Sequence, residues 1–245
     1  MSMRLHHHLK YKSEKKEVTL ETLKHFSMFF KEIPSQIQHV CVFDIETIPD
    51  SEKVETYYTD EELQQKQSEY EISLGFHKVV AFSYAIVDFS KFKIIENDAF
   101  VNVDDELGLL SQIHNTLSKY TKFSTFNGKN YDLPVLERRS LLNGLRYKRE
   151  RNVDYLKHLY VLANDLQNQP WNHLDLFQVL NMHRQKGGLN LLVDQLGLTK
   201  YNNLRGNQVA ELVRSGDTET LYNYAKHDAY LEATLLIEVV DFFKK

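Results

Sequence analysis

The stretch HVCVFDIETIPD, residues 39–50, most constrains how this chain can fold, because it places two carboxylates inside an apolar run that predicts a buried β-strand. Side chains two apart on a strand project from the same face, so Asp44 and Glu46 point to one place. Burying two unpaired carboxylates is costly, and divalent metal ions such as Mg²⁺ or Mn²⁺ would neutralise them through hard oxygen ligands. The alternative is a strand end at which both side chains reach solvent.

A second segment, FNGKNYDLPVLERR at residues 126–139, predicts a short strand that leads into a helix. Asn127, Tyr131 and Asp132 lie at this junction. Ligands usually bind at the carboxyl ends of strands in α/β sheets, so a carboxylate here can reach a site built at those ends. The alternative is an ordinary turn aspartate with no role in binding.

A third segment, YNYAKHDAYLEA at residues 222–233, belongs to a long predicted helix. Tyr224 and Asp228 are four residues apart, which places them on one face of that helix. Taken alone, Tyr224 could be a core aromatic and Asp228 a salt-bridge partner of Lys226 or His227. Together with the two earlier segments, the pair adds a phenol and a further carboxylate to the proposed metal site.

The order of the predicted elements indicates a single α/β domain with a mixed β-sheet flanked by helices. We expect an N-terminal extension over residues 1–35, partly helical, and one domain over residues 36–245. A polar helix is predicted over residues 59–73. Further strands are predicted at residues 77–88, 91–101, 122–128 and 171–176, and further helices at residues 104–120, 133–145 and 217–245.

Composition narrows the classes of protein to consider. The single cysteine, Cys41, excludes an intramolecular disulfide and predicts a reducing, cytoplasmic compartment. No run approaches about 20 apolar residues, so we expect no association with a membrane. The net charge of −4 gives no general attraction to nucleic acid, so such binding would depend on a local basic patch or on metal ions.

Five segments, taken in order, resemble the tyrosine-containing (DEDDy) branch of the DEDD superfamily of 3′–5′ exonucleases. In finer detail they are similar to the stand-alone exonucleases related to the proofreading domain of family-B DNA polymerases. The sister branch carries a histidine five residues before the last aspartate, where this chain has Asn223. The resemblance extends from about residue 38 to the C-terminus, is looser over residues 199–209, and leaves residues 1–35 uncovered. The segments are FDIETIPD, HKVVAFSYAIVD, FNGKNYDLPVLERR, HLDL and YAKHDA.

The resemblance implies an RNase H-like fold and a two-metal-ion hydrolysis of phosphodiester bonds from the 3′ end of single-stranded DNA. Asp44, Glu46 and Asp228 would hold one Mg²⁺ or Mn²⁺ ion. Asp44 would also bridge to a second ion, which Asp132 would help to hold through a water molecule. Tyr224 would orient the attacking water, because a phenol with an ordinary pKa near 10 is a poor base at neutral pH.

The expected partner is a single-stranded nucleic acid, with DNA favoured over RNA, and the sequence does not identify protein partners. Asn127, Tyr131, Arg138 and Arg139 are candidates for contacts with it. The last two begin a segment, residues 137–151, with six basic residues that could bind phosphates or form the solvated face of a helix. A 3′–5′ exoribonuclease with the same catalytic set and a non-catalytic nucleic-acid-binding module are the alternative functions.

Three aromatic side chains could stack on terminal bases, although we expect each of them to pack in the core or at its rim instead: Phe126, Tyr131 and Trp171. For His173 and Asp175, in the segment HLDL, we expect a structural role near the sheet rather than a catalytic one.

Overall fold

The computed structural model describes residues 39–59, 62, 74–145, 173–180, 188–198 and 204–244. The helix expected in the N-terminal extension, most of the polar helix expected over residues 59–73, the end of the basic segment after residue 145, and Trp171 all lie outside the described residues. Among the described helices, none combines the length and apolar character that crossing a membrane requires.

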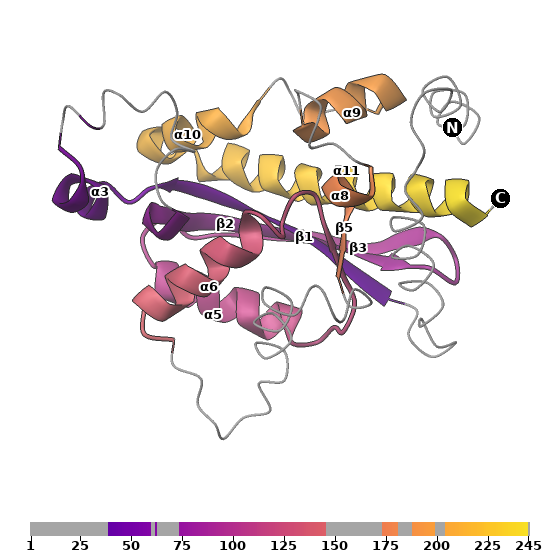
Figure 1. The fold of residues 1–245 in the computed structure, drawn as a ribbon, viewed down its shortest axis with the longest axis horizontal. Coiled ribbons are helices and arrows are strands. Elements are labelled where there is room, and N and C mark those ends of the chain that lie inside the picture. Colours follow the sequence, from indigo (N-terminus) through magenta and orange to yellow (C-terminus); the bar gives the residue numbers. More distant parts are fainter. Residues whose placement is uncertain are drawn as a thin grey trace.

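A five-stranded mixed sheet lies at the centre of the fold, with the strand order β3-β2-β1-β4-β5 (Figure 1). β1 pairs with β2 and β2 with β3 in antiparallel fashion, whereas β1–β4 and β4–β5 are parallel. This arrangement confirms the predicted mixed sheet. The strands are β1 (His39–Pro49), β2 (His77–Asp88), β3 (Lys93–Val101), β4 (Phe123–Thr125) and β5 (His173–Asp175).

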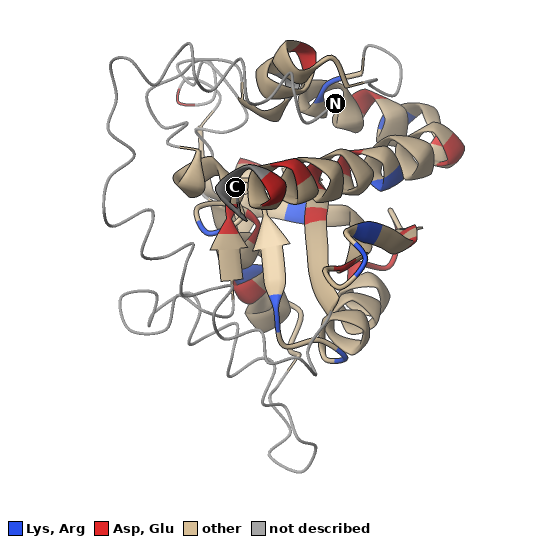
Figure 2. Ribbon diagram, turned by 90° about the vertical axis from the view of Figure 1, so that its right-hand side faces the viewer, with Lys and Arg blue, Asp and Glu red and all other residues tan. Residues whose placement is uncertain are grey.

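Helices cover both faces of the sheet, so the domain has three layers (Figures 1 and 2). α5 (Glu106–Leu117) and α6 (Asp132–Leu142) lie on one face. α10 (Val209–Ser215) and α11 (Thr218–Lys244) lie on the other, and α11 packs across β1, β2 and β3. The shorter helices are α3 (Ser51–Tyr57), η2 (Leu74–Phe76), α8 (Leu176–Val179), α9 (Gly188–Leu196) and η4 (Gly206–Gln208).

The side chains of β1 alternate between the two helical layers, as the two-residue period of a strand requires. Cys41, Phe43 and Ile45 are buried in one apolar cluster with residues of α5 and α6. Val40 and Val42 are buried in another cluster with residues of α11. Asp44 and Glu46 continue the second series, so the strand directs both carboxylates toward α11 rather than into the α5–α6 layer.

Arg139 does not have the role that the sequence suggested. Only 2% of the residue is exposed. Its Nε donates to Glu106 Oε1 at 2.8 Å, and its Nη1 donates to Asp50 Oδ2 at 2.8 Å and to the Gly75 carbonyl oxygen at 3.1 Å. The predicted contact between Arg139 and nucleic acid is therefore wrong, because its guanidinium group ties α6 to α5 and to the segment before α3. The adjacent Arg138 is exposed.

Candidate active site

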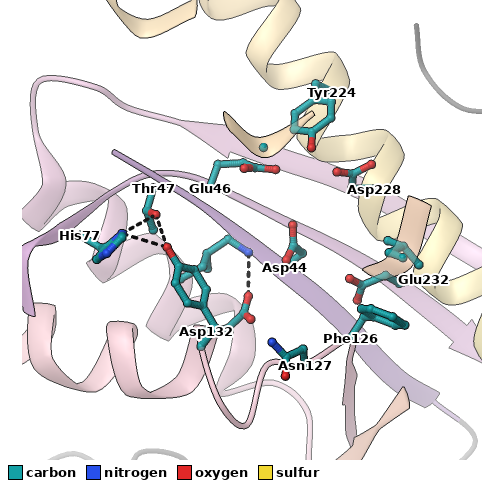
Figure 3. A pocket seen from close by; sticks show the side chains of 14 residues that line it. Asp44, Glu46, Thr47, His77, Phe126, Asn127, Asp132, Tyr224, Asp228 and Glu232 are labelled. Atoms are coloured by element: carbon teal, nitrogen blue, oxygen red, sulfur yellow. Dashed lines mark hydrogen bonds between the residues drawn. The ribbon is translucent and has the colours of Figure 1, made fainter. Parts of the chain in front are cut away.

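Three carboxylates from two distant segments meet beside the sheet (Figure 3). One carboxylate oxygen from each of Asp44, Glu46 and Asp228 lies within 4.8 Å of the other two. The first two project from β1, and Asp228 faces them from α11. A β-bulge follows immediately, because the register of β1 against β2 shifts between Glu46 and Thr47. Bulges are common beside active sites, where they redirect a side chain or end the pairing of strands.

Asp132 adds a fourth carboxylate from the first turn of α6. The residue is buried, and its Oδ1 accepts a hydrogen bond of 3.0 Å from the backbone N–H of Ile45. This bond joins the start of α6 to β1 between the two strand carboxylates. A negative charge is also favoured at this position, because the helix dipole is positive at its N-terminal end.

The loop between β4 and α6 is shaped by interactions that its sequence dictates. Asn127 has a φ of 69°, which asparagine tolerates better than most residues. A Cβ added at Gly128 would lie 2.4 Å from Thr125 Oγ1, so the turn requires glycine there. Asp175 accepts hydrogen bonds from the backbone N–H groups of Asn127, at 2.9 Å, and Lys129, at 3.0 Å. Asp175 thus holds the loop in place.

The contacts of His173 join neighbouring strands of the sheet. The residue is buried, and its Nε2 hydrogen-bonds Thr125 Oγ1 at 2.8 Å between the neighbouring strands β5 and β4. Its ring stacks on Phe43 of β1. These contacts, like those of Asp175, agree with the structural role that we expected for the pair.

Tyr224 lies one helical turn before Asp228, and its hydroxyl points toward the Asp228 carboxylate (Figure 3). Burial, followed by the charges of Glu46 and Asp228, raises the pKa of Tyr224 well above its usual value. The phenol therefore keeps its proton at neutral pH. It can donate a hydrogen bond at this site, but it cannot serve as a general base.

The pKa values of the four carboxylates are all raised. Burial raises the pKa of Asp132 to about 7 and that of Asp228 to about 6. Burial and the neighbouring acids raise the pKa values of Asp44 and Glu46 well above normal. For Asp44 and Glu46 every charged neighbour that shifts the pKa is an acid, whereas the charge of His227 partly offsets the shift of Asp228. A set of closely spaced hard oxygen ligands with excess negative charge fits Mg²⁺ or Mn²⁺.

The acids surround a cavity of about 290 Å³. Asn127 and Tyr131 line it too, as we expected for residues near a substrate, whereas Arg138 and Arg139 do not. Phe126 also lines it and packs edge-on against Phe177.

Thr47 and His77 line the cavity but were missed in the sequence. The Tyr131 hydroxyl lies 2.6 Å from Thr47 Oγ1 and 3.0 Å from His77 Nδ1 (Figure 3). Nothing in the local pattern distinguishes these two residues, since their proximity to Tyr131 depends on the pairing of β1 with β2.

Glu232 is a fifth carboxylate at the cavity that sequence reasoning missed. It lies four residues after Asp228 on α11, so the helical period already placed it on the same face. That spacing was the available signal. It was overlooked because the set of site residues that the resemblance implies ends at Asp228.

Comparisons with known proteins identify the family and support the fold. Residues 69–237 match the family described as predicted 3′–5′ exonuclease related to the exonuclease domain of PolB. No curated protein matches the chain. The family B DNA polymerase of the hyperthermophilic archaeon Pyrobaculum calidifontis has a similar fold, with a TM-score of 0.56 and 15% sequence identity over 84% of this chain.

The similar region is only 25% of the polymerase chain, so this protein corresponds to a part of that enzyme. The likeness confirms the RNase H-like α/β fold that we expected. The family match extends over more than half of the chain and includes Asp132, Tyr224 and Asp228. The chain therefore belongs to the family of predicted 3′–5′ exonucleases related to the exonuclease domain of PolB.

Proposed function

We propose that this protein is a metal-dependent exonuclease that removes nucleotides from the 3′ end of single-stranded DNA with the help of two divalent ions. The convergence of Asp44, Glu46 and Asp228 within 4.8 Å carries this proposal. Three carboxylates at this spacing, with the Tyr224 hydroxyl beside them, suit phosphodiester hydrolysis better than a structural role. A non-catalytic module would have no need to retain such a costly cluster.

Each carboxylate has a proposed task. Asp44, Glu46 and Asp228 would hold one ion, and Asp44 would also contact a second, which Asp132 would help to hold through a water molecule. When bound, such ions lower the pKa of a water molecule and stabilise the negative charge on the leaving 3′ oxygen. The Ile45 N–H donates to Asp132 Oδ1 and so holds this carboxylate beside β1.

Tyr224 would hold the attacking water in line with the phosphorus atom. Its burial fixes the ring beside the carboxylates. Since the hydroxyl stays protonated, its contribution is orientation rather than proton removal.

The terminal nucleotide would lie in the cavity beside Asn127, Tyr131 and Phe126. The Tyr131 hydroxyl is engaged with Thr47 and His77, which fixes the orientation of the ring. A fixed aromatic ring at the cavity wall supports base or sugar packing. Arg138 is exposed on α6 and is proposed to contact phosphates outside the cavity.

The proposal is tested with single-stranded DNA labelled at its 5′ end, incubated with Mg²⁺, Mn²⁺ or EDTA. We expect products that shorten progressively from the 3′ end, release of mononucleotides, and no cleavage in EDTA. A matched RNA measures the preference between DNA and RNA, because the same catalytic set serves an exoribonuclease. Faster degradation of the RNA would replace DNA with RNA as the substrate.

Two further substrates test the direction of degradation. An oligonucleotide blocked at its 3′ end and a closed single-stranded circle should both resist. Rapid cleavage of the circle would identify an endonuclease and contradict the proposal. The Asp228→Asn variant serves as the control for contaminating nucleases.

A further inference from the structure

Glu232 is a buried carboxylate that the proposed catalytic set does not use. It projects from α11 into the same cavity as Asp44, Asp132 and Asp228, and only 2% of the residue is exposed. Its Oε2 atom has no hydrogen-bond partner among the described residues. A buried carboxylate oxygen without a partner is destabilising, so its presence calls for a ligand that the side chain can bind.

The charges of neighbouring acids disfavour the ionised form of Glu232. After burial, the charges of Asp132, Asp228 and Asp175 raise its pKa, and only a hydrogen bond from the Phe126 backbone acts in the opposite direction. A protonated Glu232 would not remove the difficulty, because Oε2 would then need an acceptor or a donor that the described residues do not provide. A cation in the cavity would satisfy this oxygen and balance the neighbouring acids.

Glu232 and Glu46 lie on different sides of Asp44. Figure 3 shows Tyr224, Asp228 and Glu232 following one another along α11, with Glu46 beside Tyr224 and Phe126 beside Glu232. The compact group of three carboxylates is complete without Glu232. Among the neighbouring acids, Asp132 has the largest effect on the pKa of Glu232, and these two acids have the largest effects on the pKa of Asp44.

We propose that Glu232 is a direct ligand of the second divalent ion, which it holds together with Asp44 on the side of the cavity where Asp132 lies. This inference rests on the proposed function, since it assigns a further residue to the same metal centre. Asp44 is then shared between two groups of carboxylates, one with Glu46 and Asp228 and one with Asp132 and Glu232. A direct ligand on the second side lets this chain hold both ions before nucleic acid supplies a phosphate oxygen.

The test is a Mn²⁺ titration of the protein without nucleic acid, followed by electron paramagnetic resonance of the free ion. Wild type should bind two ions. Glu232→Gln keeps the shape of the side chain and should retain one ion while weakening the other by at least about tenfold. Glu219→Gln is the matched control, because Glu219 is an exposed residue on the same helix and should not affect either ion. Asp228→Asn should weaken the other ion instead.

The outcomes separate the two proposals. A wild type that binds no Mn²⁺ would overturn the metal centre and this assignment together. A wild type that binds two ions, with Glu232→Gln indistinguishable from it, would overturn the role of Glu232 alone.

A second variant distinguishes the loss of a metal ligand from a folding defect. Glu232→Leu replaces the buried charge with an apolar side chain, which should leave the metal-free melting temperature equal or higher. It should lose the same ion, and a Glu232→Leu protein that binds both ions as wild type does would also overturn the assignment.

Discussion

At the scale of single residues, Tyr224 shows how one side chain can matter to catalysis without changing its own charge. Its hydroxyl points toward Asp228, and burial together with the surrounding acids keeps it protonated. The residue therefore contributes a hydrogen-bond donor in a set of side chains that otherwise only accept.

The Tyr224→Phe variant isolates this donor, because it removes the hydroxyl and keeps the ring and all carboxylates. Loss of one transition-state hydrogen bond costs about 2–4 kcal/mol, so we expect single-turnover cleavage to slow by roughly 30- to 1000-fold. DNA binding in Ca²⁺ should change little, since no ligand and no phosphate contact is lost. An unaltered cleavage rate would reduce Tyr224 to a packing residue.

Substitution of Asp44 or Asp228 by asparagine should lower activity without lowering stability. Either change to asparagine should lower the cleavage rate by at least about 100-fold, because an amide does not supply the charge of a metal ligand. Without metal, each variant should melt no lower than wild type, since removal of one charge relieves repulsion in the cluster. Substantial activity in both folded variants would contradict the metal-dependent mechanism.

At the scale of elements, β1 and α11 place most of the site. β1 alternates between two apolar clusters, and its even-numbered positions carry Asp44 and Glu46 toward α11. α11 presents Tyr224, Asp228 and Glu232 at successive four-residue steps. Both periods are visible in the sequence, and for this reason the central carboxylates could be predicted from it.

Other features of the site could not be predicted because they depend on pairing between distant elements. The neighbours of Tyr131, namely Thr47 and His77, come from two strands whose register the sequence does not state. Arg138 and Arg139 are adjacent and equally basic, yet one is exposed and the other buried. Only the packing of α6 against α5 decides which of the two meets Glu106.

Arg139 supports a prediction about the packing of α6. Arg139→Met removes the positive partner of Glu106, which is itself 5% exposed, and of Asp50. Breaking a buried ion pair from one side costs about 3–5 kcal/mol, so we expect a loss of this size in the free energy of unfolding. Urea unfolding of both variants provides the measurement. The neighbouring Arg138→Met should stay within about 0.5 kcal/mol of wild type.

An Arg139→Met protein with the unfolding midpoint of wild type would refute this structural role. If Arg139→Met also bound single-stranded DNA more weakly while Arg138→Met did not, the result would support the original prediction that Arg139 contacts nucleic acid.

At the scale of the whole molecule, the fold positions the site where three layers meet. The mixed sheet supplies Asp44 and Glu46, the α5–α6 layer supplies Asp132, and the α11 layer supplies the remaining acids. The strands and long helices of the described part agree with their predicted positions to within a few residues. The strand order could not be derived from the periodicity of the sequence, because β4 and β5 contribute only three residues each.

This concentration of acids should make the stability of the metal-free protein depend on pH. The pKa of Asp132 is raised to about 7, and those of Asp44, Glu46 and Glu232 are also raised by burial. An aspartate in the unfolded chain has a pKa of about 3.9, so the folded state binds more protons than the unfolded state up to the raised pKa values. Stability contributed in this way is lost as the pH rises through those values.

We therefore expect the melting temperature in EDTA to fall between about pH 6.5 and pH 8, the window in which Asp132 titrates. His114 does not interfere in this window. Burial lowers its pKa to about 4, so its effect on stability has the opposite sign and lies between that value and about 6.5, the pKa of histidine in an unfolded chain. Each 1 kcal/mol corresponds to roughly 2–4 °C in a domain of this size. Asp132→Asn should make the fall smaller.

Mg²⁺ or Mn²⁺ competes with protons for the carboxylates, so the ion should raise the melting temperature more at pH 8 than at pH 6.5. A melting temperature in EDTA that rises over this window, or a metal effect that is larger at pH 6.5, would show that the acids do not form a repelling, metal-binding cluster.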